Sequence, residues 1–274
     1  MSVINTNVSA MYSQNAMKTN ARAMSTAMEQ LSTGVRVNSA KDDAAGLAIG
    51  QNMTSQIRGL NQAVRNLNDG INMMQTAEGA MVEQSNMLQR MRELAVQSMN
   101  GTYSDVQRGY LDKEFQALST QIGKIATDTK WNDQTLLDAS VNGSGGFIYQ
   151  AGMSAGQTVT VSIAAMTLTG LGIGDALIDT SARAGTSLGL ISTALEKINS
   201  QRAEIGAGIN RMAYAADNLM NISSNATQSR STIMDTDYAL ATTQLAKAQI
   251  IQQAATAMLA QANQQPQTVM TLLK

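Results

Sequence analysis

The chain has 274 residues, a net charge of −1 and neither cysteine nor histidine. The missing cysteines and histidines exclude disulfides, zinc–thiolate and histidine-based metal sites, and Ser-His-Asp or Cys-His catalysis. With 14% charged residues and no net basic charge, the chain lacks the electrostatic footprint of a nucleic-acid-binding protein. Aromatic residues make up 3% and methionine occurs 19 times, so we expect an aliphatic core that suits helix-on-helix packing.

The N-terminal residues have neither the basic region nor the apolar region of a secretory signal peptide. No apolar run approaches the ~18 residues needed to cross a bilayer, so we expect no membrane insertion. The protein is therefore expected either to stay inside the cell or to leave by a route that does not read a cleavable signal.

Helices are predicted from the spacing of apolar residues and from their start and stop signals. In chain order, the predicted helices cover residues 8–33, 44–99, 104–129, 186–231 and 235–263. Asp42 or Asp43 can cap the second helix, and Ser104 with Gln107 forms a capping box at the start of the third. Pro266 is expected to end the last helix, because proline cannot donate a helical hydrogen bond.

The pattern changes between the third and fourth helices. Residues 147–150 and 158–163 have strand character, and the stretch 152–156 between them is expected to form a turn. Residues 164–185 are rich in glycine and are predicted as a short, irregular, variable loop. We therefore expect a mainly α fold with a small β-hairpin around 147–163 in the middle of the chain.

Two long rows of apolar residues at heptad spacing lie toward the two ends of the chain. The first row is Leu60, Leu67, Met74, Met81, Leu88 and Ala95, and the second is Ile191, Ile198, Ile205, Met212, Leu219, Ala226 and Ile233. This spacing is typical of a coiled-coil seam. As a helix, the second row would be about 70 Å long at roughly 1.5 Å per residue. We therefore expect a long antiparallel helical bundle or coiled coil from both chain ends. A chain of this kind is expected to form an elongated assembly.

The two terminal helices have narrow stripes of small residues and are expected to pair with each other or with neighbouring copies, since most helical stability comes from packing. We expect a discontinuous inner domain of residues 1–43 and 232–274, and an outer helical domain of residues 44–231. The residues predicted to act in polymerisation are Leu31, Leu245, Ala248, Ile251, Ala255, Leu259 and Ala262.

Several long motifs lie in order near the two ends of the chain. They cover residues 3–7, 31–46, 68–71 and 90–98 in the first half, and 235–239, 248–254 and 259–267 in the second. Together they resemble bacterial flagellin. Only about 140–186 lacks a strong match, and it is too short for the large outer domains of longer flagellins, so the resemblance is to a short form of the family.

The resemblance implies a structural subunit that self-assembles into the extracellular flagellar filament for swimming motility. In this family the terminal helices pair in an inner tube, and the long helices form an outer shell. The family is exported unfolded through the filament channel. The implied partners are further copies of the chain, an export chaperone, the filament cap and the hook-junction proteins. No cofactor, metal or enzymatic activity is implied.

Residues 90–96 resemble the flagellin segment that a Toll-like innate receptor senses. The suspected receptor-binding residues are Gln89, Arg90, Leu94 and Glu114, with the arginine as a possible anchor of the interface. Without the resemblance, Arg90 and Glu114 are interpreted as ordinary surface charges, and Leu94 as a residue that packs on its neighbours.

Two alternatives to a filament subunit remain. A related axial adaptor, such as a hook–filament junction protein, shares the architecture but should match the terminal motifs less closely. An enzyme is the other alternative, since some flagellins carry a zinc protease, but that site needs histidines that this chain lacks. The chain has three pairs of nearby carboxylates, Asp42/Asp43, Asp112/Glu114 and Asp235/Asp237. They are interpreted as helix caps and solvent-exposed surface residues.

Overall fold

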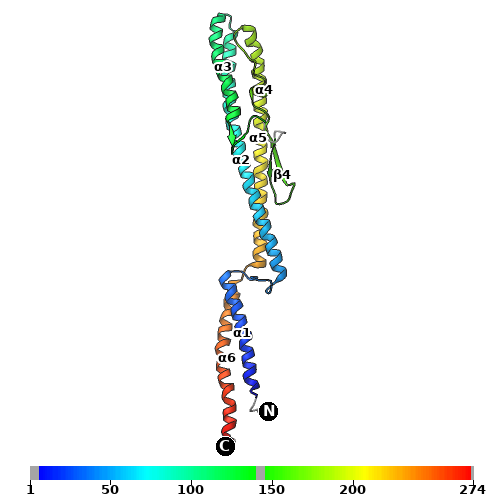
Figure 1. Ribbon diagram of the computed structural model, residues 1–274, viewed down its shortest axis with the longest axis vertical. Coiled ribbons are helices and arrows are strands. Elements are labelled where there is room, and N and C mark those ends of the chain that lie inside the picture. The colour runs from blue at the N-terminus through cyan, green and yellow to red at the C-terminus, as the bar shows by residue number, and fades with distance from the viewer. Residues whose placement is uncertain (1–5, 140–145, 273–274) are drawn as a thin grey trace. The chain divides into compact units, whose positions relative to one another are not determined.

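The computed structural model describes residues 6–139 and 146–272, with side chains described as far as Gln264. Its helices are α1 (Val8–Thr33), α2 (Ala44–Met99), α3 (Asp105–Asp128), α4 (Leu168–Leu171), α5 (Ser181–Met234) and α6 (Tyr238–Leu272). Its strands are β1 (Lys130–Trp131), β2 (Gln134–Thr135), β3 (Gly146–Gln150) and β4 (Thr158–Ser162). The prediction of a mainly α fold with a small antiparallel strand region in its middle is confirmed (Figure 1).

The chain packs as two compact units. One unit contains Met1–Ile57 with Ser224–Lys274, and the other contains Arg58–Ser223. Both boundaries fall inside long helices, so α2 and α5 each contribute to both units. The division expected from the sequence, at 43/44 and 231/232, falls instead at the start of α2 and inside the last turn of α5, and it stays a prediction.

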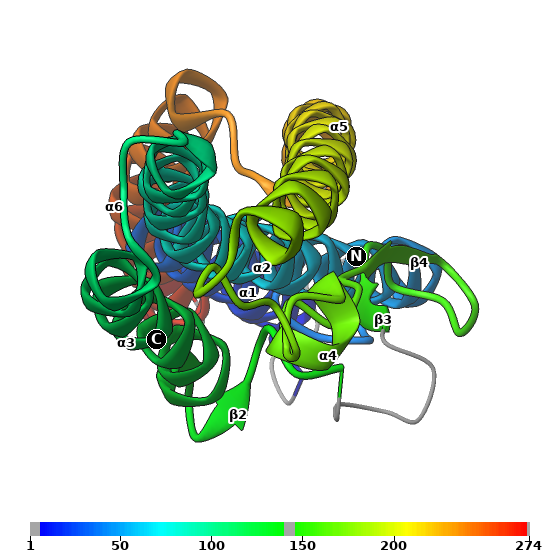
Figure 2. The same cartoon turned by 90° about the horizontal axis from the view of Figure 1, so that it is seen from above.

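The core of the unit Arg58–Ser223 is formed by α2, α3 and α5, which run alongside one another in Figures 1 and 2. The heptad rows of α2 and α5 supply much of this core. Their members with no exposed surface are Leu67, Met74, Met81, Leu88, Ala95, Ile191, Ile198, Ile205 and Met212. Burial of each large aliphatic side chain stabilises the fold by roughly 1.5–3 kcal/mol, so these rows are a major source of the unit's stability.

Gln84 is a fully buried amide side chain within the described part of this core. Its Nε2 donates to the carbonyl of Ile122 in α3 at 3.2 Å and to the carbonyl of Met166, in the segment after β4, at 3.1 Å. A buried donor that is left unpaired costs stability, so both bonds specify where α3 and this segment lie against α2.

The segment between β4 and α5 is part of the core. Ile173 and Ile178 are fully buried, and the carboxylate of Asp112 accepts the N–H of Ile178 at 2.9 Å. The prediction of an irregular loop over 164–185 was therefore wrong in part. Thr180 caps α5 through the N–H of Arg183, so the helix begins at Ser181 and α4 precedes it.

The predicted hairpin is confirmed as the antiparallel pair β3–β4. Phe147 lies opposite Val161, and Tyr149 lies opposite Val159. These four side chains are buried or half-buried, whereas Ile148 between them is 63% exposed, as expected for the period-two alternation of a strand.

A second, shorter hairpin, β1–β2, was not predicted from the sequence. Its turn residues Asn132 and Asp133 have positive φ angles of 48° and 64°. Positive φ at both central positions is the geometry of a two-residue hairpin turn, and asparagine and aspartate tolerate it better than most residues.

Most predicted helix boundaries are confirmed by their caps. Gly34 ends α1 in the left-handed conformation at φ 71°, and Ser104 with Gln107 forms the capping box of α3. Asp43 Oδ1 accepts the N–H of Gly46 at 2.8 Å at the start of α2.

The prediction that Pro266 ends the last helix was wrong, because α6 continues to Leu272. Proline removes the N–H that would bond to the carbonyl of Ala262, four residues earlier. Asn7 Nδ2 donates to that carbonyl at 2.8 Å, so the hydrogen bond missing from the helix is replaced from α1.

Candidate assembly and recognition surfaces

The terminal helices α1 and α6 pack against each other in antiparallel fashion (Figure 1). Asn20 of α1 donates to the carbonyl of Ala248 at 2.7 Å, and Asn7 donates to that of Ala262. A short amide side chain reaches a backbone carbonyl only when two helices lie close together, and alanines at the contact permit this approach. Buried Ala27 in α1 and Ala241 in α6 continue the same pattern.

The connectors at one end of this pair are joined by backbone bonds. The N–H of Arg36 donates to the carbonyl of Met234 at 2.6 Å, and the N–H of Thr236 donates to that of Gly34 at 3.0 Å. Arg36 Nη2 also donates to the carbonyl of Ile233 at 2.7 Å. These bonds hold the end of α1 beside the beginning of α6, which fixes the antiparallel direction of the pair.

The residues predicted to act in polymerisation mostly belong to the contact within this pair. Ala248 and Ala262 are buried, and the half-buried members are Leu31, Leu245, Ala255 and Leu259. Ile251 is 41% exposed. The expectation that α1 and α6 pair with each other therefore agrees with the structure, and a role of these side chains between copies stays a prediction.

A different set of apolar residues points outward from the pair. The most exposed are Tyr12 at 74%, Ile250 at 67% and Met258 at 62%. Val8, Met11, Leu240 and Ile251 are also exposed. We call this set the outer apolar face. Lys247 is the only charged residue between 238 and 272, so the α6 part of the face meets little electrostatic repulsion.

Sequence reasoning missed most of the outer apolar face, although one signal was available. The last helix carries apolar residues around its whole circumference, which is typical of a helix that is buried on several sides. The stripe with the cleanest periodicity is the one that α1 covers.

The suspected receptor-binding residues divide between surface and core. Arg90 is exposed and forms ion pairs with Glu93 at 2.9 Å and Glu114 at 3.0 Å. The hydrogen bond from Arg90 to Glu93 is the main cause that raises the pKa of Arg90, and the hydrogen bond to Glu114 is the second. Gln89 is exposed, whereas Leu94 is 1% exposed and belongs to the core. Gln89, Arg90 and Glu114 are therefore the accessible members of the set.

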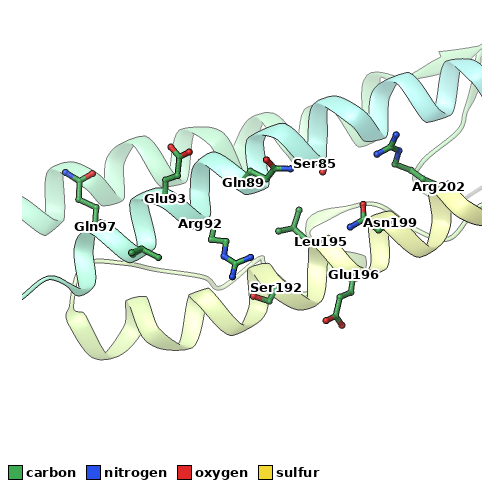
Figure 3. Close-up of a pocket in the computed structure, with 11 residues that line it drawn as sticks. Ser85, Gln89, Arg92, Glu93, Gln97, Ser192, Leu195, Glu196, Asn199 and Arg202 are labelled. Carbon is green, nitrogen blue, oxygen red and sulfur yellow. The ribbon is translucent and has the colours of Figure 1, made fainter.

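A polar groove of about 1040 Å³ lies between α2 and α5 (Figure 3). It contains charges of both signs, with Arg92 and Glu93 from α2 and Glu196 and Arg202 from α5. Arg92 reaches toward Ser192 across the groove in Figure 3. The groove has no enclosed apolar pocket of the kind that takes a small molecule.

Most of the carboxylates singled out in the sequence have structural partners. Asp43 caps α2, Asp112 binds the N–H of Ile178, and Glu114 pairs with Arg90. Asp237 caps α6 by accepting the N–H of Ala239 at 2.9 Å. Among residues 6–139 and 146–272, no group of three or more acidic, cysteine or histidine side chains has the arrangement of a metal site. No helix in the described part of the chain is long and apolar enough to span a membrane.

Fold and surfaces together define a helical structural protein that presents an apolar face on its paired terminal helices. Its sequence matches the family models for the bacterial flagellin N-terminal helical region over residues 4–142 and C-terminal helical region over residues 188–273. The chain therefore belongs to the bacterial flagellin family, and it is a structural subunit of the extracellular flagellar filament.

Individual relatives agree with this assignment over nearly the whole chain. The flagellin of Halalkalibacterium halodurans is 41% identical, with 99% of this chain and 100% of the relative covered. The flagellar filament 31.3 kDa core protein of Treponema maltophilum is 40% identical, again with 99% and 100% covered. The resemblance to a short form of the family is confirmed, since both relatives align end to end.

Two solved structures share the fold. The crystal structure of Bacillus cereus flagellin covers 57% of this chain and 88% of its own, with 32% identity and a TM-score of 0.51. A protein of Vibrio parahaemolyticus described as flagellar hook-associated covers 71% of this chain and 100% of its own, with a TM-score of 0.61 but only 16% identity. At that identity the second likeness concerns the fold alone.

Proposed function

We propose that the chain enters the filament through the outer apolar face of α1 and α6. The observation that carries this proposal is the exposure of Tyr12, Ile250 and Met258 on helices that have little charge to keep copies apart. Exposed apolar patches mark interaction surfaces, and contacts that repeat without closing build open polymers. The inner stripe then has the separate task of holding the two helices together.

Seeded assembly tests this proposal. Purified protein is incubated under salting-out conditions, with and without short fragments of sheared flagellar filaments, and is viewed by negative-stain electron microscopy. We expect long filaments that grow from the fragments. Persistent monomers whose helical core is intact by circular dichroism would contradict the proposal and would favour the hook–filament junction adaptor, whose architecture is similar.

Ala255→Arg provides a further test of the terminal helices. Ala255 is half-buried in the stripe that α1 covers, so arginine there should separate α1 from α6 and block polymerisation. The unit Arg58–Ser223 should stay folded, since Ala255 lies outside it. A variant that still forms filaments, with an unchanged circular dichroism spectrum, would count against this role.

We further infer that the chain is exported unfolded through the growing filament, with an export chaperone, the cap and the hook-junction proteins as partners. The lack of cysteine supports an unfolded passage, because no disulfide has to form or break on the way. Export of a chain whose unit Arg58–Ser223 is locked by an engineered disulfide should stop, and reduction should restore it. Undiminished export of the locked chain would contradict this route.

Recognition of the monomer by a Toll-like innate receptor is a second proposed property. The exposed guanidinium of Arg90, with Gln89 beside it and Glu114 as its partner, supports such an interface. Arg90→Ala should lower receptor activation by the monomer without changing its fold, and assembled filaments should activate poorly. Equal activation by Arg90→Ala and the unmodified protein would refute this proposal.

A further inference from the structure

Asn7 has two hydrogen bonds of opposite polarity. Its Oδ1 accepts the N–H of Ala10 at 3.0 Å and so caps α1, while its Nδ2 donates to the carbonyl of Ala262 in α6 at 2.8 Å. One partner is a donor and the other an acceptor, so the orientation of the amide is determined. Aspartate or serine would also cap the helix, but only asparagine caps it while donating an N–H to a second helix.

The acceptor of this bond is unusual within α6. Ala262 lies four residues before Pro266, the only proline of the chain, and proline has no N–H to donate. The carbonyl of Ala262 therefore lacks the backbone N–H, four residues later, that bonds to other carbonyls inside α6. Asn20 provides a comparison, because its acceptor, the carbonyl of Ala248, lies four residues before Gln252, which has an N–H.

The alanine row of α6 does not define a register by itself, although the row Leu245, Gln252, Leu259 and the connector bonds of Arg36 and Thr236 favour the observed one. Ala241, Ala248, Ala255 and Ala262 recur at seven-residue intervals, so sliding α6 along α1 by one heptad replaces alanine with alanine. Such a slip moves the helix by roughly 10 Å, at about 1.5 Å per residue. In coiled coils, a single polar residue in the seam commonly selects one register from several.

We propose that Asn7 and Pro266 together reinforce the register of the α1–α6 pair at the end far from its connector bonds. Proline leaves one carbonyl of the repeating stripe without a donor, and Asn7 supplies that donor only in the observed register. The register in turn fixes how the α1 part of the outer apolar face lies relative to the α6 part. The pairing itself stands on the structure, whereas its consequence for the filament rests on the proposed function.

Engineered cysteine pairs can measure the register directly, because the chain has no cysteine of its own. Between the bonds Asn7–Ala262 and Asn20–Ala248, interpolation places Ser13 opposite Ala255, and both are half-buried. Ser13→Cys with Ala255→Cys reports the observed register. Ser13→Cys with Ala248→Cys or with Ala262→Cys reports a slip of one heptad in either direction.

Each pair is oxidised in the full chain, both in solution and in pelleted filaments. The product within one chain is identified by its monomeric mobility and by peptide mass spectrometry. We expect cross-linking in the observed register to exceed that in the slipped registers by at least about tenfold, or ~1.4 kcal/mol. The test variants are Asn7→Asp, which keeps the cap but not the donor, and Pro266→Ala, which restores the helical N–H.

Both test variants should reduce the ratio of cross-linking in the observed register to cross-linking in the slipped registers about tenfold. Asn7→Asp should have no further effect on this ratio in the Pro266→Ala background. Asn20→Ala is the matched control and should change the ratio much less. An unchanged ratio in both test variants, or a loss in Asn20→Ala as large as in Asn7→Asp, would overturn the proposal. Failure of the unmodified chain to form filaments contradicts the proposed function, whereas an unchanged ratio contradicts only the register device.

Discussion

The ring of Tyr149 packs directly on the backbone of α2 at Gly70. A Cβ atom built on Gly70 would lie 2.7 Å from Cε1 of Tyr149, closer than such atoms approach in proteins. On α5, a Cβ on Gly208 would lie 3.0 Å from Cγ2 of Val161. One strand of the hairpin thus uses a glycine of α2 and the other a glycine of α5, so the hairpin is seated on both helices.

Gly70→Ala should therefore displace the hairpin. Overpacking costs about 1–3 kcal/mol, and alanine returns up to about 1 kcal/mol of helix propensity, so we expect a net loss of roughly 1 kcal/mol in the free energy of unfolding. Gly79→Ala in the same helix is the matched control, because no described atom beyond its chain neighbours and the local helix backbone lies within 4 Å of its Cβ position. It should stabilise by up to about 1 kcal/mol in urea denaturation. A Gly70→Ala protein as stable as Gly79→Ala would contradict the seating.

Arg108 closes the turn between α2 and α3. It is 8% exposed, and it donates to the carbonyls of Ser98 at 2.8 Å and Asn100 at 3.1 Å while pairing with Asp105. The first bond satisfies a carbonyl in the last turn of α2, which has no helical partner, and the second holds the turn that follows α2. Arg108→Ala should lower the free energy of unfolding by about 2–3 kcal/mol, since hydrogen bonds to charged groups are worth about 1.5–3 kcal/mol.

Arg211, an exposed arginine of α5, is the control for this change. Arg211→Ala should shift the free energy of unfolding by less than about 0.5 kcal/mol, as surface substitutions usually do. Equal effects of the two arginine substitutions would show that the turn does not depend on Arg108.

The effects of Leu94→Ala and Arg90→Ala on the free energy of unfolding should distinguish a core residue from a surface residue. Leu94→Ala removes a core side chain and should cost about 2–5 kcal/mol, measured by chemical denaturation. Arg90→Ala breaks exposed ion pairs, which contribute little to stability because solvent screens them. If Arg90→Ala destabilised the chain as much as Leu94→Ala, a change in receptor activation could not be assigned to a lost contact.

Asp42 should make the connector before α2 sensitive to acid. The Ser39 hydroxyl donates to Asp42 Oδ2 at 2.8 Å, and this bond lowers the pKa of Asp42 below its ordinary value. Because the folded pKa is lowered, the contribution is complete above the unfolded pKa and is lost as pH falls through the folded one. Ser39→Ala should move the pKa of Asp42 upward in an NMR titration. An unchanged value would show that the hydroxyl is not the cause.

The helices could be predicted from the sequence because their signals are local. The capping box of Ser104 and Gln107 and the glycine after Thr33 fix boundaries without reference to the rest of the fold. The heptad rows also give the buried side of α2 and α5, since Leu67 and Ile198 need only the periodicity to be placed. A local signal of this kind needs no knowledge of the tertiary partner.

The failures concern features that depend on partners distant in sequence. The segment containing Ile173 and Ile178 looks irregular, yet Asp112 and the core of α2 and α3 hold it in place. Pro266 is a stop signal in isolation, but Asn7, at the other end of the chain, satisfies the carbonyl that it leaves free. The inner stripe of α6 could be predicted from its periodicity, but the outer apolar residues could not, because only the position of α1 shows which apolar side chains of α6 stay exposed.

Assembly of an Ile250→Arg variant tests the role of the outer apolar face most directly. Ile250 is 67% exposed, so arginine there should leave the helical content and the Ser13–Ala255 cross-link unchanged. In a seeded sedimentation assay under salting-out conditions, we expect the pelleted fraction to fall at least about tenfold, while the control Ile250→Met pellets like the unmodified protein. Normal filament yield from Ile250→Arg would contradict assembly through this face.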